Sequence, residues 1–501
     1  MRTAALSTLY LVLVQLPGGD PLPSIRRQPA VVALGPVRQL FVDDYLIDRM
    51  DSVFRSLGAP AKERTNPVFK PEMPWEGRRI LYSDVLFDPD EKVYKLWYSV
   101  HDEKTNQAGL CYSRSPDGLH FERPELGLVS AAGSTRNNLI LLPAGGMASD
   151  KGIFKDQHDP DPRRRYKMVY MKPGTIGMSV AWSADGLRWT AYEHNPVLLP
   201  TGDGGPKALW DELRGRYLLY VRPDGHHVRR WSKVADAADF PTRRIGLAES
   251  VDFKMWTDVE QVLAPDERDG VGTEFYYMLV LPYQGMYVGF LMVYHEYTGD
   301  PRPLEGFNYT LEVQLTASRD GRKWTRVCER QTFLGGDTRT WDEKRIYADS
   351  AVVRGDEIWI YYRGSNVPHR AIGETIGKST GGRTFLGDAL GIARLRLDGF
   401  VAVQALDRPG ILTTKPLSFD SARELRVNVA AAGGSLEVEA LTLFGEPIRG
   451  FTRQECRSIT ADEIHRRVEW SSGRALGDLP QPVRLRFFLR NASLYSFELI
   501  R

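Results

Sequence analysis

A short phrase that recurs four times is the feature that most constrains the fold of this chain. It consists of a serine, an aspartate two residues later, a glycine directly after the aspartate (phenylalanine in the third copy), and an aromatic residue three positions further on. The serines stand at positions 115, 183, 250 and 318, a period of 67 or 68 residues. A fixed period of this kind indicates repeated supersecondary units. The copies are Ser115–Phe121, Ser183–Trp189, Ser250–Trp256 and Ser318–Trp324.

Each phrase has the chemistry of a turn between two strands, because Ser and Asp side chains bond to nearby backbone N–H groups and Gly supplies a positive φ. An apolar strand precedes each phrase, and a stronger β-branched and aromatic run lies further upstream. A weaker fifth copy ends at Leu397-Asp-Gly-Phe400. Five units of about four strands predict an all-β fold, a five-bladed β-propeller. The upstream strands are expected at residues 93–98, 166–170, 217–221, 287–293 and 358–362.

From Gly410 onward the pattern changes to short alternating strands at residues 425–429, 435–439 and 483–489. Such alternation is typical of sheets with one buried face, and about 90 residues of it predict a β-sandwich. We therefore expect four parts in the chain. They are a signal peptide at residues 1–19, a linker at 20–37, a five-bladed β-propeller at 38–408 and a C-terminal β-sandwich at 409–501.

The N-terminal segment has the pattern of a secretory signal, with Arg2, a mostly apolar run from Ala4 to Leu16, and Gly18-Gly19 after it. We expect a secreted or periplasmic protein; the alternative is an untranslocated or mis-started N-terminus. The apolar run is too short to span a bilayer, and no later run reaches 18 apolar residues.

Composition narrows the class of partner and of site. The net charge of +2 gives no support to a nucleic-acid partner, and the oligomeric state stays open. The three scattered cysteines, Cys111, Cys328 and Cys456, have neither a disulfide framework nor a metal-binding spacing, so we expect them to be packing residues.

An acidic residue lies in or beside the first strand of every predicted blade. First strands line the central channel of a propeller, so their carboxylates converge and their pKa values separate. Cleavage of a glycosidic bond needs such a pair of carboxyl groups around the acetal. The alternative is that these acids bind backbone amides or bridge blades through arginines. The acids are Asp84, Asp156, Asp203, Asp211, Glu274, Asp342 and Glu343.

Aromatic residues beside these acids favour a sugar ligand, since sugar rings stack on aromatic faces; packing between blades is the alternative. The aromatic residues are Trp75, Tyr82, Trp210, Tyr276, Tyr277 and Tyr347.

A further predicted strand, residues 38–47, carries Asp43 and Asp44 in its middle, which indicates either a turn or edge position or a strand that lines a pocket.

The order of several short segments resembles one known group. The segments are Leu40-Phe-Val-Asp-Asp-Tyr-Leu-Ile47, Pro74-Trp-Glu76, Phe154-Lys-Asp156, Ala317-Ser-Arg-Asp-Gly321, Leu397-Asp-Gly-Phe400 and Gly445-Glu-Pro-Ile-Arg-Gly-Phe451. They resemble secreted bacterial proteins, of planctomycete type, that are similar to the N-terminal domain of glycoside hydrolase family 32. The resemblance spans residues 38–500 and is weaker for the characterised enzymes of families 32, 43 and 68.

The resemblance implies a five-bladed propeller with an Asp on blade one, an Asp on blade two and a Glu on blade three as functional acids. By position Asp156 matches the second acid. Asp84 is nearest to the first, with Asp43 and Asp44 as rivals, and the expected Asn-Asp-Pro is absent. Glu274 is the nearest match to the third, one blade later than expected.

These observations predict a glycoside hydrolase that acts on a poly- or oligosaccharide. Asp84 is expected to be the nucleophile or base, Asp156 to hold a substrate hydroxyl and tune the acid, and Glu274 to be the general acid. We expect no cofactor and no metal ligand set, although a structural divalent cation in the channel stays open. The alternatives are a non-catalytic glycan-binding propeller and a sialidase. Substrate contacts are expected from Asp44, Trp75, Asp203, Asp211, His295 and Arg345.

Overall fold

A computed structural model describes most of the chain. Strands dominate it, so the all-β class predicted from the sequence is confirmed. The described residues contain no α-helix; their helical segments are the 3-10 turns Pro162–Arg164, Cys328–Arg330, Arg453–Glu455 and Leu476–Asp478. The expected signal peptide and Asp203 lie outside the described residues. Those are residues 30–102, 107–131, 133–140, 151–172, 177–201, 204–223, 243–270, 272–295, 310–369, 387–420 and 422–500.

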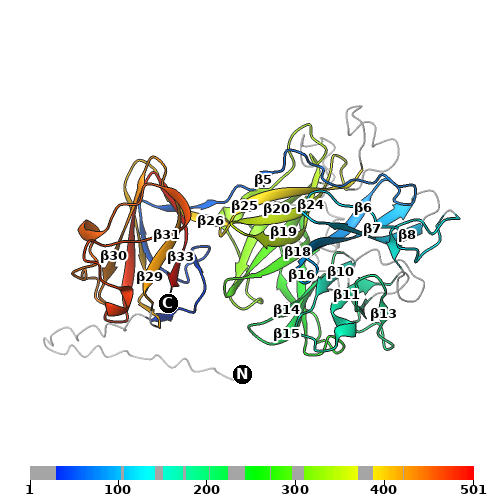
Figure 1. The fold of residues 1–501 in the computed structure, drawn as a ribbon, viewed down its shortest axis with the longest axis horizontal. Helices are drawn as coiled ribbons and strands as arrows, with labels where there is room; N and C mark the ends of the chain where they lie inside the picture. Colours follow the sequence, from blue (N-terminus) through cyan, green and yellow to red (C-terminus); the bar gives the residue numbers. More distant parts are fainter. Residues whose placement is uncertain are drawn as a thin grey trace, which may run out of the picture.

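Five antiparallel units follow one another along the chain, and in each the first strand pairs with the second and the second with the third (Figure 1). Unit 1 contains β6 (Ile80–Asp88), β7 (Val93–Asp102), β8 (Gln107–Ser115) and β9 (Leu139–Ile140). Unit 2 contains β10 (Lys151–Lys155), β11 (Tyr166–Met171), β12 (Met178–Ser183) and β13 (Thr190–Ala191). Unit 3 contains β14 (Lys207–Asp211), β15 (Arg216–Val221), β16 (Ile245–Ser250) and β17 (Glu260–Leu263). Unit 4 contains β18 (Thr273–Tyr283), β19 (Met286–His295), β20 (Thr310–Ser318), β21 (Thr325–Arg326) and β22 (Thr332–Leu334).

Unit 5 takes its fourth strand from the N-terminal part of the chain. Its own strands are β23 (Arg345–Arg354), β24 (Glu357–Ser365) and β25 (Ala389–Arg396), and β5 (Ala61–Lys62) pairs antiparallel with β25. The ammonium of Lys62 also donates to Asp342, just before β23, at 2.7 Å. A segment that precedes unit 1 therefore completes the last unit.

The five first strands contact one another in a closed circle, from β6 through β10, β14, β18 and β23 back to β6. We call this circle the central ring. Its strands run in one direction: Lys151 at the start of β10 bonds to Asp84 of β6, and Lys155 at the end of β10 bonds to Asp88 at the end of β6. The ring thus has a starting end, where the first strands begin, and a finishing end.

The recurring phrase forms the predicted turn each time. In the first copy Ser115 Oγ accepts from Gly118 N at 2.9 Å, and Asp117 Oδ1 accepts from Leu119 N at 2.8 Å. The other three copies show the same bonds to within 0.1 Å or so. Three of these turns also join neighbouring units, because an aromatic side chain of the preceding unit bonds to the turn glycine's carbonyl. These bonds are Trp97 to Gly186, Tyr220 to Gly321 and, between units 5 and 1, Tyr361 to Gly118.

The C-terminal strands form two sheets that share one buried core, in which Phe41, Val427, Leu436, Phe487 and Phe497 take part. Strands from both ends of the chain build them (Figure 1). One sheet contains β2 (Gln39–Leu40), β4 (Phe54–Leu57), β26 (Val401–Ala405), β29 (Glu424–Ala430), β31 (Asp462–Arg467) and β33 (Ala492–Ile500). The other contains β3 (Ile47–Asp51), β27 (Gly410–Thr414), β30 (Ser435–Leu441) and β32 (Arg484–Arg490), and β1 (Val32–Ala33) pairs with β28 (Leu417–Ser418).

The expectation of one continuous strand over residues 38–47 was wrong. Only residues 39–40 and 47 are in strands, and the chain bends between them. Asp43 explains the bend, since its carboxylate accepts a hydrogen bond from the backbone N–H of Tyr45 at 3.1 Å. Asp43 and Asp44 indicated either a turn or edge position or a pocket-lining strand, and the structure has a bend there.

Candidate functional site

Asp84 lies in the middle of β6, is 5% exposed, and is held by two lysines. Its Oδ2 accepts from Lys151 Nζ at 2.6 Å and its Oδ1 from Lys207 Nζ at 2.7 Å. These lysines are the first residues of β10 and β14. Burial lowers the pKa of Lys151, while Asp84 acts in the opposite direction. The first strands of units 1, 2 and 3 therefore meet in one buried ion cluster.

A second buried carboxylate, Asp349 of β23, lies beside it. Asp349 accepts from Ser83 N at 3.1 Å, from Ser83 Oγ at 2.5 Å and from Arg363 Nε at 2.5 Å, and it also bonds to the hydroxyl of Tyr277. Burial alone would raise the pKa of Asp349, but Arg363 and then Lys207 outweigh it and lower that pKa. This carboxylate joins units 1, 4 and 5 at the ring.

Three of the first strands carry a β-bulge where these side chains lie. The bulges include Tyr82 in β6, Tyr276 and Tyr277 in β18, and Asp349 in β23. Tyr82 has a φ of 39°, a strained value for a residue with a side chain. Bulges redirect side chains and are frequent beside active sites. The bulge in β18 contains Tyr277, whose aromatic ring stacks on that of Tyr347 in β23 with centroids 6.1 Å apart.

A third buried carboxylate, Asp388, lies at the starting end between units 5 and 1. It accepts from Arg345 Nη2 at 2.6 Å and from Arg79 Nε at 2.9 Å. Arg345 begins β23 and Arg79 directly precedes β6. Burial would raise the pKa of Asp388, but the two arginines outweigh it and bring that pKa to about 2.

Glu274, the second residue of β18, is paired with Arg243 and is 5% exposed. The Arg243 guanidinium also lies over the rings of Tyr276, at 5.5 Å, and Tyr294, at 5.2 Å. The hydroxyl of Tyr276 lies 2.9 Å from Nε2 of His369. Glu274 is thus at the starting end, beside a partly exposed tyrosine.

Asp156 and Asp211 lie at the finishing end instead. Asp156, directly after β10, accepts from the backbone N–H groups of His158, at 2.9 Å, and Asp159, at 3.2 Å. Asp211 ends β14 and pairs with Arg214 at 2.6 Å. Asp88, which has the equivalent place at the end of β6, is four residues and hence about 13 Å along the strand from Asp84. The catalytic role expected for Asp156 stays a prediction.

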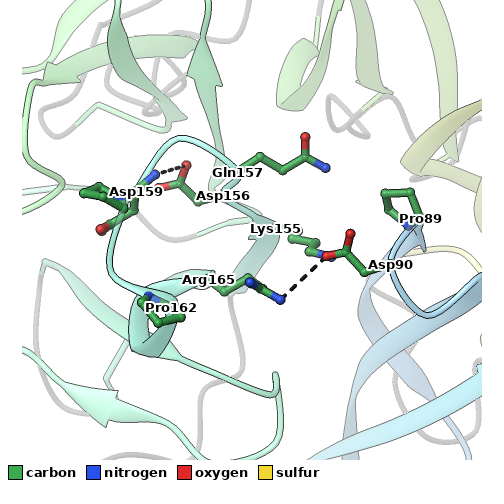
Figure 2. Close-up of a pocket in the computed structure, with 9 residues that line it drawn as sticks. Pro89, Asp90, Lys155, Asp156, Gln157, Asp159, Pro162 and Arg165 are labelled. Atoms are coloured by element: carbon green, nitrogen blue, oxygen red, sulfur yellow. Dashed lines mark hydrogen bonds and ion pairs between the residues drawn. The ribbon is translucent and has the colours of Figure 1, made fainter.

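Figure 2 shows the cavity of about 450 Å³ that Asp156 lines at the finishing end, between units 1 and 2. Its charged groups pair across the cavity, with Asp90 2.7 Å from Lys155 and 3.6 Å from Arg165. The lining residues are Pro89, Asp90, Lys155, Asp156, Gln157, Asp159, Pro160, Pro162 and Arg165.

Of the substrate contacts expected from the sequence, Arg345 and His295 are at the starting end. His295 ends β19, which pairs with the strand that carries Glu274. Asp44 is exposed in the turn before β3, beside the C-terminal sheets. Trp75 bonds to Asn138 at 2.9 Å and packs between units 5 and 1.

Sequence reasoning missed most of the charged groups at the starting end of the central ring: Lys151, Lys207, Asp349, Arg363 and Asp388. A signal was present for two of them. Asp349 lies within β23 and Arg363 within β24, and a buried charge in a mostly apolar strand needs a partner.

No group of three or more His, Cys, Asp or Glu side chains suited to a metal ion occurs in the described residues. All three cysteines are free thiols; Cys111 and Cys456 are buried. Within the described part of the chain, no helix has both the length and the apolar character needed to cross a membrane.

Comparisons with known proteins found likenesses among solved structures only. No protein-family model matches the chain, and no curated protein matches it. A glycosyl hydrolase from Bacteroides ovatus superposes with a TM-score of 0.45 at 15% identity, over 68% of this chain and 94% of its own. A GH32 β-fructofuranosidase of Bombyx mori gives 0.44 at 11% identity, over 87% and 94%. An N-acetylgalactosamine deacetylase from F. plautii gives 0.41 at 16% identity, over 70% and 97%. All three TM-scores are below 0.5.

Proposed function

We propose that this protein is a glycoside hydrolase that binds its sugar at the starting end of the central ring. We also propose that the five units are the blades of a five-bladed β-propeller and that the two C-terminal sheets form a β-sandwich. The observation that carries the proposal is that first strands of several units carry buried carboxylates with aromatic residues beside them. Asp84 and Glu274 come from first strands of different units, and the partly exposed Tyr82 and Tyr276 accompany them.

The two carboxyl groups suit different roles in this reaction. Asp84 is the base or nucleophile: a carboxylate has about four lone-pair positions, and two lysine bonds leave about two of them for water or a sugar. Glu274, near the beginning of β18, is assigned as the general acid, a role in which it has to leave its ion pair with Arg243 and carry a proton. Partly exposed tyrosines offer an apolar face to a sugar ring and a hydroxyl to its oxygens.

The test is release of reducing sugar from a panel of plant, algal and microbial glycans. General acid–base catalysis contributes about 10²–10⁴-fold, so we expect Asp84→Asn and Glu274→Gln each to lower kcat by at least about 100-fold. Circular dichroism of each variant separates lost chemistry from lost folding. Turnover by both folded variants at the wild-type rate would reject these assignments.

A glycan-binding protein without turnover is the second candidate. It is favoured by the pairing of every carboxylate described here, Asp84 with lysines, Glu274 with Arg243 and Asp349 with Arg363. Retention of a glycan by the wild type without any release of sugar would establish it.

We also propose that residues 1–19 direct secretion. Expression of the full chain, followed by mass spectrometry of the exported protein, tests this. A mature N-terminus near residue 20 is the expected result, and an intact Met1 in the exported protein would contradict it.

A further inference from the structure

Eight of the charged groups at the starting end form one cluster with more positive than negative members. Lys207 acts on the pKa of Asp349 as well as bonding to Asp84, and Arg363 acts on the pKa of Asp388, so the groups are electrostatically connected. With all groups ionised the cluster carries two excess positive charges, and buried charge without a counter-ion is costly. Its members are Lys151, Lys207, Arg79, Arg345 and Arg363 against Asp84, Asp349 and Asp388.

The three arginines of this cluster keep donors that no described residue uses. Arg363 bonds through Nε and Nη2, and Arg345 bonds through Nε to Val367 and through Nη2 to Asp388. Arg79 bonds through Nε alone, and its side chain is 35% exposed. Within the described residues, Nη1 of each arginine and Nη2 of Arg79 have no hydrogen-bond partner. A planar guanidinium with spare N–H groups suits a carboxylate or sulfate.

Aromatic rings adjoin the same arginines. The guanidinium of Arg363 lies 5.1 Å from the ring centroid of Tyr82 and 4.5 Å from that of Tyr347. Tyr82 is partly exposed and is held in its strained conformation by the bulge in β6. A sugar ring on Tyr82 would bring a substituent within reach of these arginines.

We propose that the glycan bound at the starting end carries an anionic substituent, a carboxylate or a sulfate ester, which Arg79, Arg345 and Arg363 recognise. This inference rests on the proposed function, since it names the substrate class of that site. A neutral glycan would leave the excess charge and the spare donors uncompensated. An anionic glycan would neutralise part of this charge when it binds, so the specificity of the site would depend on the anionic substituent.

The experiment compares matched ligands by titration calorimetry with the full chain carrying Glu274→Gln, which prevents turnover. One pair is a galacturonic acid trimer and its methyl ester; the other is a sulfated carrageenan oligosaccharide and its desulfated form. We expect the anionic member of one pair to bind at least about tenfold more tightly at about 20 mM salt, with a smaller difference at about 300 mM. The ligand pair in which the anionic member binds more tightly identifies the recognised group as a carboxylate or a sulfate.

Two arginine variants localise the effect. Arg79→Gln, at the partly exposed position, should reduce the preference at least about threefold, and circular dichroism checks that the variant is folded. Arg136→Gln is the control, because Arg136 is 78% exposed and pairs with Glu125 on the surface. It should leave the preference unchanged.

Two results would overturn the proposal: equal or tighter binding of the neutral member in both pairs, or tight binding of inorganic phosphate without preference within either pair. Hydrolysis of neutral glycans alone by the wild type would also overturn it while upholding the proposed function. Preference for an anionic glycan without any hydrolysis would uphold it and reject the hydrolase.

Discussion

The hydroxyl of Tyr217 donates a 2.6 Å hydrogen bond to Oδ2 of Asp156, which fastens the second strand of unit 3 to the end of the first strand of unit 2. Tyr166 bonds in the same way to Asp88, one unit earlier. Tyr287 repeats the contact with Asp211, one unit later. A buried tyrosine–aspartate contact of the same kind thus occurs at each of three unit boundaries at the finishing end.

Loss of this contact should cost stability. Tyr217→Phe leaves a buried carboxylate with one partner fewer, so we expect the free energy of unfolding to fall by about 1–3 kcal/mol. Thermal unfolding followed by circular dichroism measures the effect. Asp156→Asn is the more informative variant, because it keeps the shape of the turn. A lowered Tm with normal kcat indicates a structural carboxylate, and a wild-type Tm with no turnover indicates the catalytic role predicted from the sequence.

The turn glycines should differ in their tolerance of a side chain. Gly186 has a φ of +77°, and a Cβ there would lie 2.6 Å from the ring of Trp97 in the neighbouring unit. Gly133 has the same φ with nothing within 4 Å, so it is a matched control. We expect Gly133→Ala to cost about 1–2 kcal/mol from backbone strain, and Gly186→Ala a further 1–3 kcal/mol or so from overpacking. Urea unfolding compares them, and equal losses would contradict the role of the close contact.

The ion cluster around Asp84 predicts an order of stability among variants. Asp84→Asn leaves Lys151 and Lys207 facing each other without their carboxylate, which should cost about 3–5 kcal/mol. Lys207→Met removes one cation and leaves Asp84 paired with Lys151, so its cost should be smaller. Differential scanning fluorimetry of both variants measures the order. If Lys207→Met were less stable than Asp84→Asn, Asp84 would not be the group that holds the two lysines together.

Asp388 should make stability depend on pH in the acid range. Its pKa is lowered from 3.8 to about 2 in the folded protein, so its contribution is fully present above about pH 4. The contribution, roughly 2 kcal/mol from this shift, is lost as the pH falls from about 4 to about 2. Unfolding of the wild type and of Asp388→Asn between pH 2 and 7 tests this. We expect the gap between the two proteins to narrow over that window, and a constant gap would contradict the assignment.

The sequence predicted the parts of the fold that local chemistry specifies. The turn at Ser115–Phe121 needs only its own Ser and Asp oxygens, and the strand at residues 93–98 needs only its apolar pattern, so both were found. The contacts of Lys151 and Lys207 with Asp84 join residues more than 60 positions apart, and no local pattern encodes them. The same holds for β5, whose two residues gain their strand conformation only by pairing with β25.

In the candidate site, the position of an acidic residue along its strand predicts its location better than the residue type alone does. Asp84, Asp156 and Asp211 are all acids of first strands, yet Asp84 lies in the strand and the other two at its end. At the end of a strand, an Asp side chain can accept hydrogen bonds from backbone N–H groups of the following turn, as Asp156 does from His158. Counting residues from each hairpin turn would have separated the two groups before the structure was known.

The pairing of β5 with β25 has a consequence for how the protein is made. Residues 61–62 leave the ribosome more than 300 residues before their partners at 393–394, and β2 waits longer still for β33. Both halves of the molecule therefore reach their final hydrogen bonding only near the end of translation. Until then, the nascent chain carries unpaired strand edges that other chains can bind, so chaperones and the speed of synthesis should decide how much of it folds correctly.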